Sequence, residues 1–214
     1  MSRFGWSDRV SLFLGFAFLY APIAILVIYS FNESRLVTVW AGFSTKWYGE
    51  LFRNEQLLDA AWISFLVAVS ASTLAAIFGT LAGVALARIP RFLGRTLFSG
   101  MVLAPLVMPE VITGLSLLLT FSAVGMDRGI VTIVIAHATF SMCYVAVVVQ
   151  ARLAGFDDSV EEAAMDLGAR PATVFWRVTL PLIAPGIIAG WLLSFTLSLD
   201  DLVIASFLAG PGST

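Results

Sequence analysis

Long apolar stretches separated by short polar segments are the dominant pattern of this sequence. Each stretch is long enough to cross a hydrocarbon core of ~30 Å as an α-helix, the structure that satisfies its own backbone hydrogen bonds in lipid. We therefore expect an all-α polytopic membrane protein, with residues 1–214 forming a single transmembrane domain. The predicted spans are residues 10–31, 60–87, 96–126, 129–150 and 178–210.

The first stretch has some features of a secretory signal, because Arg3 and Arg9 precede the apolar run. However, residues 10–31 contain no charge, are long enough to span a bilayer, and are not closed by a cleavage site with small residues. A retained first helix is therefore the better interpretation.

The distribution of basic residues predicts the direction of the spans. Lysine and arginine favour cytoplasmic ends, and here they are more numerous in alternate connecting segments. This places the N-terminus, the turn at residues 88–95 and the segment 152–177 in the cytoplasm. The basic residues on that side are Arg3, Arg9, Arg88, Arg91, Arg95, Arg152, Arg170 and Arg177.

Composition excludes several classes of function. Hydrophobic residues make up 59% of the chain and charged residues 12%, which is too apolar for a fully water-solvated surface. A net charge of −2 with dispersed basic residues does not favour nucleic-acid binding. Cys143 and His137 are the only residues of their types, so an internal disulfide and a Cys/His zinc site are both excluded. We expect no cofactor.

Two of the spans have distinctive residues. In the second span Ala75, Gly79, Gly83 and Ala87 recur every four residues and form a flat stripe, which another helix can approach closely. In the third span Pro105 and Pro109 disfavour a straight helix, so we expect a kink or a break near Pro109.

The cytoplasmic segment 157–181 is too polar for lipid and too well patterned for a slack loop. Ser159 and Glu162 fit a capping box, Gly168 fits a helix end, and Pro171 fits a first helical turn, which predicts two short helices joined at Gly168. Helical spacing gathers an apolar face that suits a partner's groove or the chain's own helix ends. The face consists of Val160, Ala163, Ala164 and Leu167.

This segment resembles the EAA loop of the permease subunits of type I ABC importers. The match runs from Glu162-Ala163-Ala164 through Gly168 to Val178-Thr179-Leu180-Pro181, with the complete spacing of the family. The resemblance implies a MetI-like fold and a segment that docks on an ATPase subunit and couples ATP hydrolysis to transport. The coupling residues that it implies are Glu162, Ala163, Ala164, Leu167 and Gly168.

Glu162 also has a simpler interpretation as a helix cap that touches no partner, and both roles are compatible. The chain is not expected to be an enzyme. Its only lysine, Lys46, lies outside any Gly-rich phosphate-binding turn, so ATP hydrolysis is expected on the partner. The resemblance further implies a second, paired permease, a periplasmic solute-binding protein and the bacterial inner membrane as location.

Charged groups inside spans are costly and therefore functional candidates. Helical rise places Glu110 and Asp200 at a similar depth, and His137 can approach the same level from the outer side. With Asp201, these acids would attract a cationic solute. The alternative is structural, with Glu110 capping a half-helix and Asp200 or Asp201 anchoring an outer gate.

The sequence around these acids resembles the polyamine subgroup of the permeases, in particular the putrescine-type subunit. The resemblance is carried by residues 108–116, by residues 198–207 and by the outer loop at Trp40 to Ser44 with Trp47 and Tyr48. Such permeases usually have a sixth span, which is apparently missing here. The alternatives are an ABC permease for another small solute, an ion-driven secondary transporter, which would not need an EAA segment, and an intramembrane protease, whose motif is absent.

Overall fold

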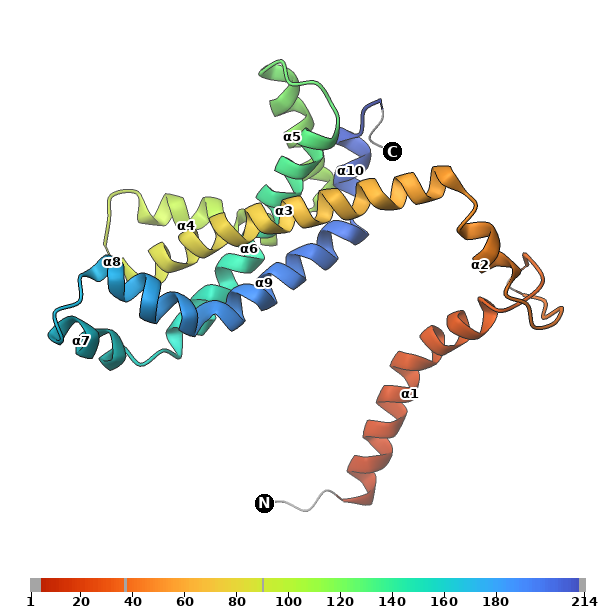
Figure 1. Ribbon diagram of the computed structural model, residues 1–214, viewed down its shortest axis with the longest axis horizontal. Coiled ribbons are helices and arrows are strands. Elements are labelled where there is room, and N and C mark those ends of the chain that lie inside the picture. The colour runs from red at the N-terminus through yellow and green to blue at the C-terminus, as the bar shows by residue number, and fades with distance from the viewer. Residues whose placement is uncertain (1–4, 37, 90, 212–214) are drawn as a thin grey trace. The chain divides into compact units, whose positions relative to one another are not determined.

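The computed structural model describes residues 5–36, 38–89 and 91–211, and within these ranges the regular structure is helical apart from one isolated bridge between Asn32 and Phe43. Arg3 of the predicted topology lies outside them. The chain divides into two compact units, Met1–Asp59 and Ala60–Thr214. Figure 1 shows the path of the chain.

The N-terminal unit contains helix α1 (Trp6–Tyr29) and the short helix α2 (Lys46–Leu51). None of the described residues of α1 is buried, and the helix is apolar on all sides, as expected for a helix solvated by lipid. Its bounds agree with the first predicted span to within a few residues.

Between α1 and α2 the chain folds around one amide side chain. Asn32 is 1% exposed, and its Nδ2 donates to the carbonyls of Leu36 and Val39 at 3.4 and 2.7 Å. Its Oδ1 accepts from the backbone N–H groups of Ser34 and Ala41 at 3.3 and 2.9 Å. The polar loop is therefore held by four hydrogen bonds to a single residue.

The larger unit is built on α3 (Glu55–Arg88), α6 (Ile130–Ala154) and α9 (Leu180–Asp200). A Cβ added at Gly79 would lie 2.6 Å from the carbonyl oxygen of Met142, and one at Gly83 would lie 2.8 Å from that of Ala146. The small-residue stripe of α3 therefore lets α6 approach as predicted, although Ala87 at its end is exposed.

The α6–α9 interface uses small and polar residues as well. A Cβ at Gly190 would lie 3.2 Å from the Val145 side chain, and the hydroxyl of Ser194 donates to that of Ser141 at 2.7 Å. Both serines are buried, so this hydrogen bond satisfies them away from water. Close packing and a buried hydroxyl pair are typical of helix association in membranes.

The third predicted span is broken, as expected from its prolines. Helix α4 (Arg95–Leu103) continues into a 3₁₀ turn, Ala104–Leu106, and α5 (Glu110–Ala123) starts after Pro109. The two halves are bent by 117°. Four helices in the described ranges are long and apolar enough to span a membrane, and the bent pair makes a fifth if it is counted as one span.

The C-terminal region differs from the prediction in two ways. After α7 (Ser159–Asp166), the helix α8 (Pro171–Val174) is not separate, because it continues through a π-helical segment, η2 (Phe175–Thr179), into α9. Pro181 lacks the N–H that an α-helical turn would use there, which explains the irregular turn. The run 178–210 is also not one helix, since α9 ends at Asp200 and α10 (Val203–Leu208) follows.

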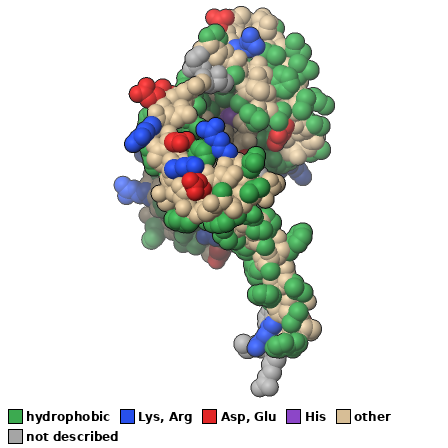
Figure 2. Space-filling view, turned by 90° about the vertical axis from the view of Figure 1, so that its right-hand side faces the viewer, with side chains coloured by type: hydrophobic (Ala, Val, Ile, Leu, Met, Phe, Trp, Pro, Cys, Tyr) green, Lys and Arg blue, Asp and Glu red, His purple; other side chains and the backbone are tan. Residues whose placement is uncertain are grey.

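The capping box predicted for Ser159 and Glu162 is wrong. Ser159 lies inside α7, and its backbone N–H donates to the carboxylate of Asp157 at 3.0 Å. The N-cap position is Asp158, whose side chain makes no capping hydrogen bond, and the Asp157 contact is a local hydrogen bond that competes with the predicted box. Figure 2 shows hydrophobic side chains over much of the visible face, with acidic and basic side chains between them.

Candidate functional site

The predicted intramembrane acids line one cavity. Its volume is about 320 Å³, and the helix start at Glu110, the end of α9 at Asp200 and the turn at Asp201 all border it. These segments meet because α10 packs on α5, where a Cβ at Gly114 would lie 2.8 Å from the ring of Phe207. The remaining lining residues are Phe140, Thr196, Leu197, Leu202 and Val203.

The adjacent acids Asp200 and Asp201 lie in different environments. Asp200 is exposed, as is Glu110, whereas the side chain of Asp201 is only 6% exposed. Asp201 accepts the backbone N–H of Ile204 through Oδ1 at 2.8 Å, so it caps the start of α10. The contact is local and holds the turn between α9 and α10, and the predicted anchoring of an outer gate stays a prediction.

His137 lies behind this cavity in the protein interior. It is 3% exposed, and its Nδ1 is 2.7 Å from the hydroxyl of Ser198 on α9. Its Nε2 is 3.7 Å from Oδ2 of Asp201, and both residues border a smaller cavity of about 70 Å³. The structure therefore brings His137 to Asp201, and not to the cavity that Glu110 and Asp200 line.

Two exposed carboxylates on one cavity can act on a cation directly. In a partly apolar surrounding, the attraction between unit charges is several times stronger than in bulk water. Thr196 also lines the cavity and was not among the predicted site residues; its hydroxyl-bearing side chain lies one helical turn before Asp200. That four-residue spacing on α9 was the available signal.

The predicted coupling residues lie on an outward face of α7. Glu162 and Ala163 are exposed, Ala164 is half-buried, and Leu167 is 89% exposed. The Glu162 carboxylate makes no hydrogen bond or ion pair with the described residues. Gly168 has a φ of +87°, a left-handed conformation that turns the chain from α7 toward α8.

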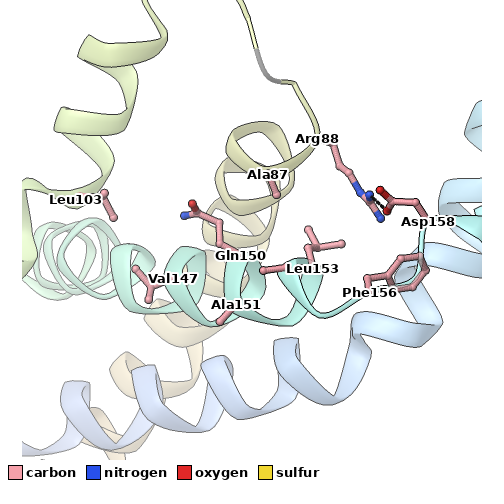
Figure 3. Close-up of a pocket in the computed structure, with 10 residues that line it drawn as sticks. Ala87, Arg88, Leu103, Val147, Gln150, Ala151, Leu153, Phe156 and Asp158 are labelled. Atoms are coloured by element: carbon pink, nitrogen blue, oxygen red, sulfur yellow. Dashed lines mark hydrogen bonds and ion pairs between the residues drawn. The ribbon is translucent and has the colours of Figure 1, made fainter.

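The inner side of α7 is attached to the end of α3. Arg88 forms ion pairs with Asp158 and with Glu161, the latter at 3.1 Å, and its guanidinium lies 5.2 Å from the centre of the Phe156 ring. Figure 3 shows Arg88, Asp158 and Phe156 at one end of a cavity of about 620 Å³. From sequence, Arg88 contributed only to the predicted topology, because its partners lie about 70 residues away along the chain.

The start of α7 carries a perturbed acid. Hydrogen bonds from the Ser159 side chain and then from its backbone N–H hold the pKa of Asp157 below its ordinary value. Because this pKa is lowered in the folded chain, its contribution to stability is present above the ordinary aspartate pKa and is lost as the pH falls through the lowered value. Asp157 therefore remains ionised at neutral pH and keeps its hydrogen bonds to Ser159.

No group of three or more histidine, cysteine, aspartate or glutamate residues within the described ranges is arranged to hold a metal ion. Cys143 is a buried free thiol on α6. Two candidate functional regions remain to be considered. One is the cavity that Glu110 and Asp200 line, called the acid cavity below, and the other is the outward surface of α7.

Comparison with known proteins gives a consistent result. The model of the family "Binding-protein-dependent transport system inner membrane component" matches residues 75–214. The chain is 60% identical to the putrescine transport system permease protein PotI of Escherichia coli K12, over 96% of this chain and 75% of that protein. It is 45% identical to the spermidine/putrescine transport system permease protein PotC of Haemophilus influenzae, over 98% and 81%.

Among solved structures, the chain is similar to a chain of a bacterial ABC transporter involved in the import of the acidic polysaccharide alginate. The TM-score is 0.75 at 19% identity, and the match covers 100% of this chain and 79% of the other. This likeness shows the fold, which is that of an ABC importer permease, and so confirms the expected fold class.

Proposed function

The chain belongs to the family of binding-protein-dependent transport system inner membrane components, and from this premise we propose that it is a permease subunit of an ATP-driven polyamine importer, with putrescine as the solute. The named relatives are polyamine permeases that align over almost the whole of this chain. Their names support the choice of solute.

The acid cavity is the observation that carries the choice of solute. A diamine has two positive charges, and Glu110 and Asp200 offer two exposed carboxylates on the same cavity. The structural neighbour has the same fold, but it is involved in the import of an acidic polysaccharide. The fold therefore does not select the charge of the solute, and the side chains that line the path must contribute to selection.

ATP hydrolysis belongs to a separate subunit in this proposal. The only lysine, Lys46, precedes a tryptophan and is not part of a phosphate-binding turn. The exposed face of α7 with Ala163 and Leu167 is the docking surface for the ATPase, and Gly168 shapes its end. A paired permease and a periplasmic binding protein complete the complex, which lies in the inner membrane with the N-terminus of this chain in the cytoplasm.

The test is uptake of labelled putrescine by proteoliposomes that contain the chain with its paired permease, ATPase and binding protein. We expect Asp200→Asn and Glu110→Gln each to lower uptake, because each removes one charge from the cavity. Removal of one charge-assisted contact is expected to change uptake by about tenfold.

The matched control is Glu50→Gln, which removes one exposed acid from α2 and leaves the cavity intact. It should not alter the preference for putrescine over an uncharged solute. Normal uptake by an assembled complex that carries both cavity substitutions would reject the acid path. Uptake of another solute in preference to putrescine would reject the choice of solute but not the importer.

A further inference from the structure

We propose that Glu161 is a positioning residue that transmits movement of α7 to the membrane helices. The inference rests on the proposed function, because it assumes that an ATPase moves α7. Glu161 directly precedes Glu162, the glutamate of the EAA match, and the two acids have different roles in this proposal. Glu162 faces outward, whereas Glu161 faces the chain's own helices.

One oxygen of Glu161 connects three elements. Oε1 accepts a hydrogen bond from Nη2 of Arg88, at the end of α3, at 3.1 Å. The same Oε1 accepts the hydroxyl of Thr179, at the end of η2, at 2.5 Å. The carboxylate is thus the point at which α7, α3 and the base of α9 meet.

These contacts are sheltered from water. The side chain of Glu161 is 18% exposed and that of Arg88 is 25% exposed, while Thr179 is 3% exposed. Screening by solvent is weaker here than at an exposed ion pair, so the attraction is better able to resist a pull on α7. Arg88 also pairs with Asp158, which fixes the start of α7 to the same guanidinium (Figure 3).

Thr179 is placed where a displacement can reach the acid cavity. It ends the π-helical segment, and α9 continues from it without interruption to Asp200. α9 has 21 residues, is about 30 Å long and keeps its helical path to Asp200, although Pro185 lies within it. A shift of Thr179 therefore reaches the cavity that Asp200 lines through one continuous helix.

The irregular turn makes Thr179 a suitable point of attachment. A single π-helical turn inside a longer helix often occurs at functional sites, because the local hydrogen-bond ladder is already interrupted. Leu180-Pro181 follows directly, and proline contributes no N–H to that ladder. Movement at this point requires fewer backbone hydrogen bonds to break than movement within α9.

The experiment measures putrescine uptake and ATP hydrolysis in the reconstituted complex. Thr179→Val keeps the shape of the side chain and removes the hydroxyl, and Thr179→Ser restores it. Thr139→Val is the matched control, because the Thr139 hydroxyl bonds only to the Ile135 carbonyl of its own helix. We expect Thr179→Val to lower uptake per ATP hydrolysed by about 2- to 30-fold, the range for residues that carry coupling.

Thr179→Ser should recover most of this loss, and copurification of the ATPase should be unchanged in both variants. If the hydrogen bond between Thr179 and Glu161 were only structural, its loss would lower the amount of assembled complex. ATP hydrolysis and uptake would then fall together, and uptake per ATP hydrolysed would not change. Wild-type uptake per ATP in Thr179→Val would overturn the proposal. A wild-type complex without ATP-dependent uptake would reject the proposed function instead.

A second measurement covers the case in which Thr179→Val assembles poorly. Glu161→Gln, Arg88→Lys and their double variant form a cycle that isolates the contact between these two residues. Lysine keeps the positive charge, but its single ammonium group cannot bind Asp158 and Glu161 through two separate nitrogens as the arginine does. We expect the double variant to lose little more coupling than either single variant, and fully additive losses would overturn the shared route through Glu161.

Discussion

The carboxylates of Asp200 and Asp201 are adjacent along the chain but lie in different surroundings. Asp200 is exposed on the acid cavity, whereas Asp201 is buried between His137 and the start of α10. Neighbouring residues near a helix end point to different sides, so one can face a path while the other holds the backbone. The same division of tasks recurs at Glu161 and Glu162 on α7.

We predict that removing the two aspartates has unequal effects on the stability of the fold. Asp201→Ala should lower the free energy of unfolding by about 1 kcal/mol, because α10 loses its cap. Asp200→Ala should stay within about 0.5 kcal/mol of the wild type. Thermal unfolding of the purified chain in detergent measures both, and equal destabilisation would contradict the assigned roles.

The sequence alone predicted that these acids share a region, because helical rise places Glu110 and Asp200 at one depth. It could not separate Asp200 from Asp201, since the run of apolar residues continues past both and gives no sign that α9 ends there. Nor could it find the Glu161–Arg88 contact. That ion pair joins residues that only tertiary packing brings together.

At the scale of elements, apolar runs and prolines predicted most of the helices. The break at Pro109 follows directly from the missing backbone donor. The continuous helical path from Pro171 to Asp200 does not follow from the sequence. Prolines favour the starts of helices and interrupt their interiors, so Pro171 and Pro181 do not predict one helix through both. A π-helical turn accommodates the second proline, and such turns have no sequence signature in this chain.

We predict that Gly168 is required for its backbone and not for its size. Its φ is +87°, and an added Cβ would meet nothing within 4 Å. Gly168→Val should therefore strain the turn by about 1–2 kcal/mol and lower both ATPase binding and transport. Gly168→Asn, which tolerates this conformation, should retain most of both. Equal loss in the two variants would indicate that the partner needs the space itself.

Gly79 is required for the opposite reason, which is space. A Cβ there would lie 2.6 Å from the Met142 carbonyl oxygen and from the Val145 Cβ. We predict that Gly79→Ala costs about 1–3 kcal/mol through overpacking, measured by thermal unfolding in detergent. Gly100→Ala on α4, where nothing lies within 4 Å, is the control and should not destabilise. Similar melting of both variants would contradict the close α3–α6 approach.

At the scale of the whole molecule, the direction of insertion is the central prediction that still rests on sequence. Arginine at the start, at residues 88–95 and at residues 152–177 places the α7 segment in the cytoplasm. Cys143 is buried, which gives a convenient background for labelling. Leu167 and Phe43 are 89% and 72% exposed, so each can carry a reporter cysteine.

We predict that Leu167→Cys reacts with a membrane-impermeant maleimide only in inverted membrane vesicles. Phe43→Cys should react in intact spheroplasts, because the predicted topology places the loop between the first two spans on the outer side. The measurement is the labelled fraction in each preparation. Labelling of Leu167→Cys in intact spheroplasts would place α7 on the outer side, where a cytoplasmic ATPase cannot bind it, and would reject the importer assignment.

The length of α3 links the protein to its lipid surroundings. A helix of 34 residues is about 50 Å long, whereas a hydrocarbon core is about 30 Å thick. Even at a tilt of about 40°, the upper end for such helices, its polar ends must stand outside the core. The tilt of α3 therefore depends on bilayer thickness, and Arg88 lies at the end of this helix. We therefore expect acyl-chain length to change the rate of solute uptake by the reconstituted complex.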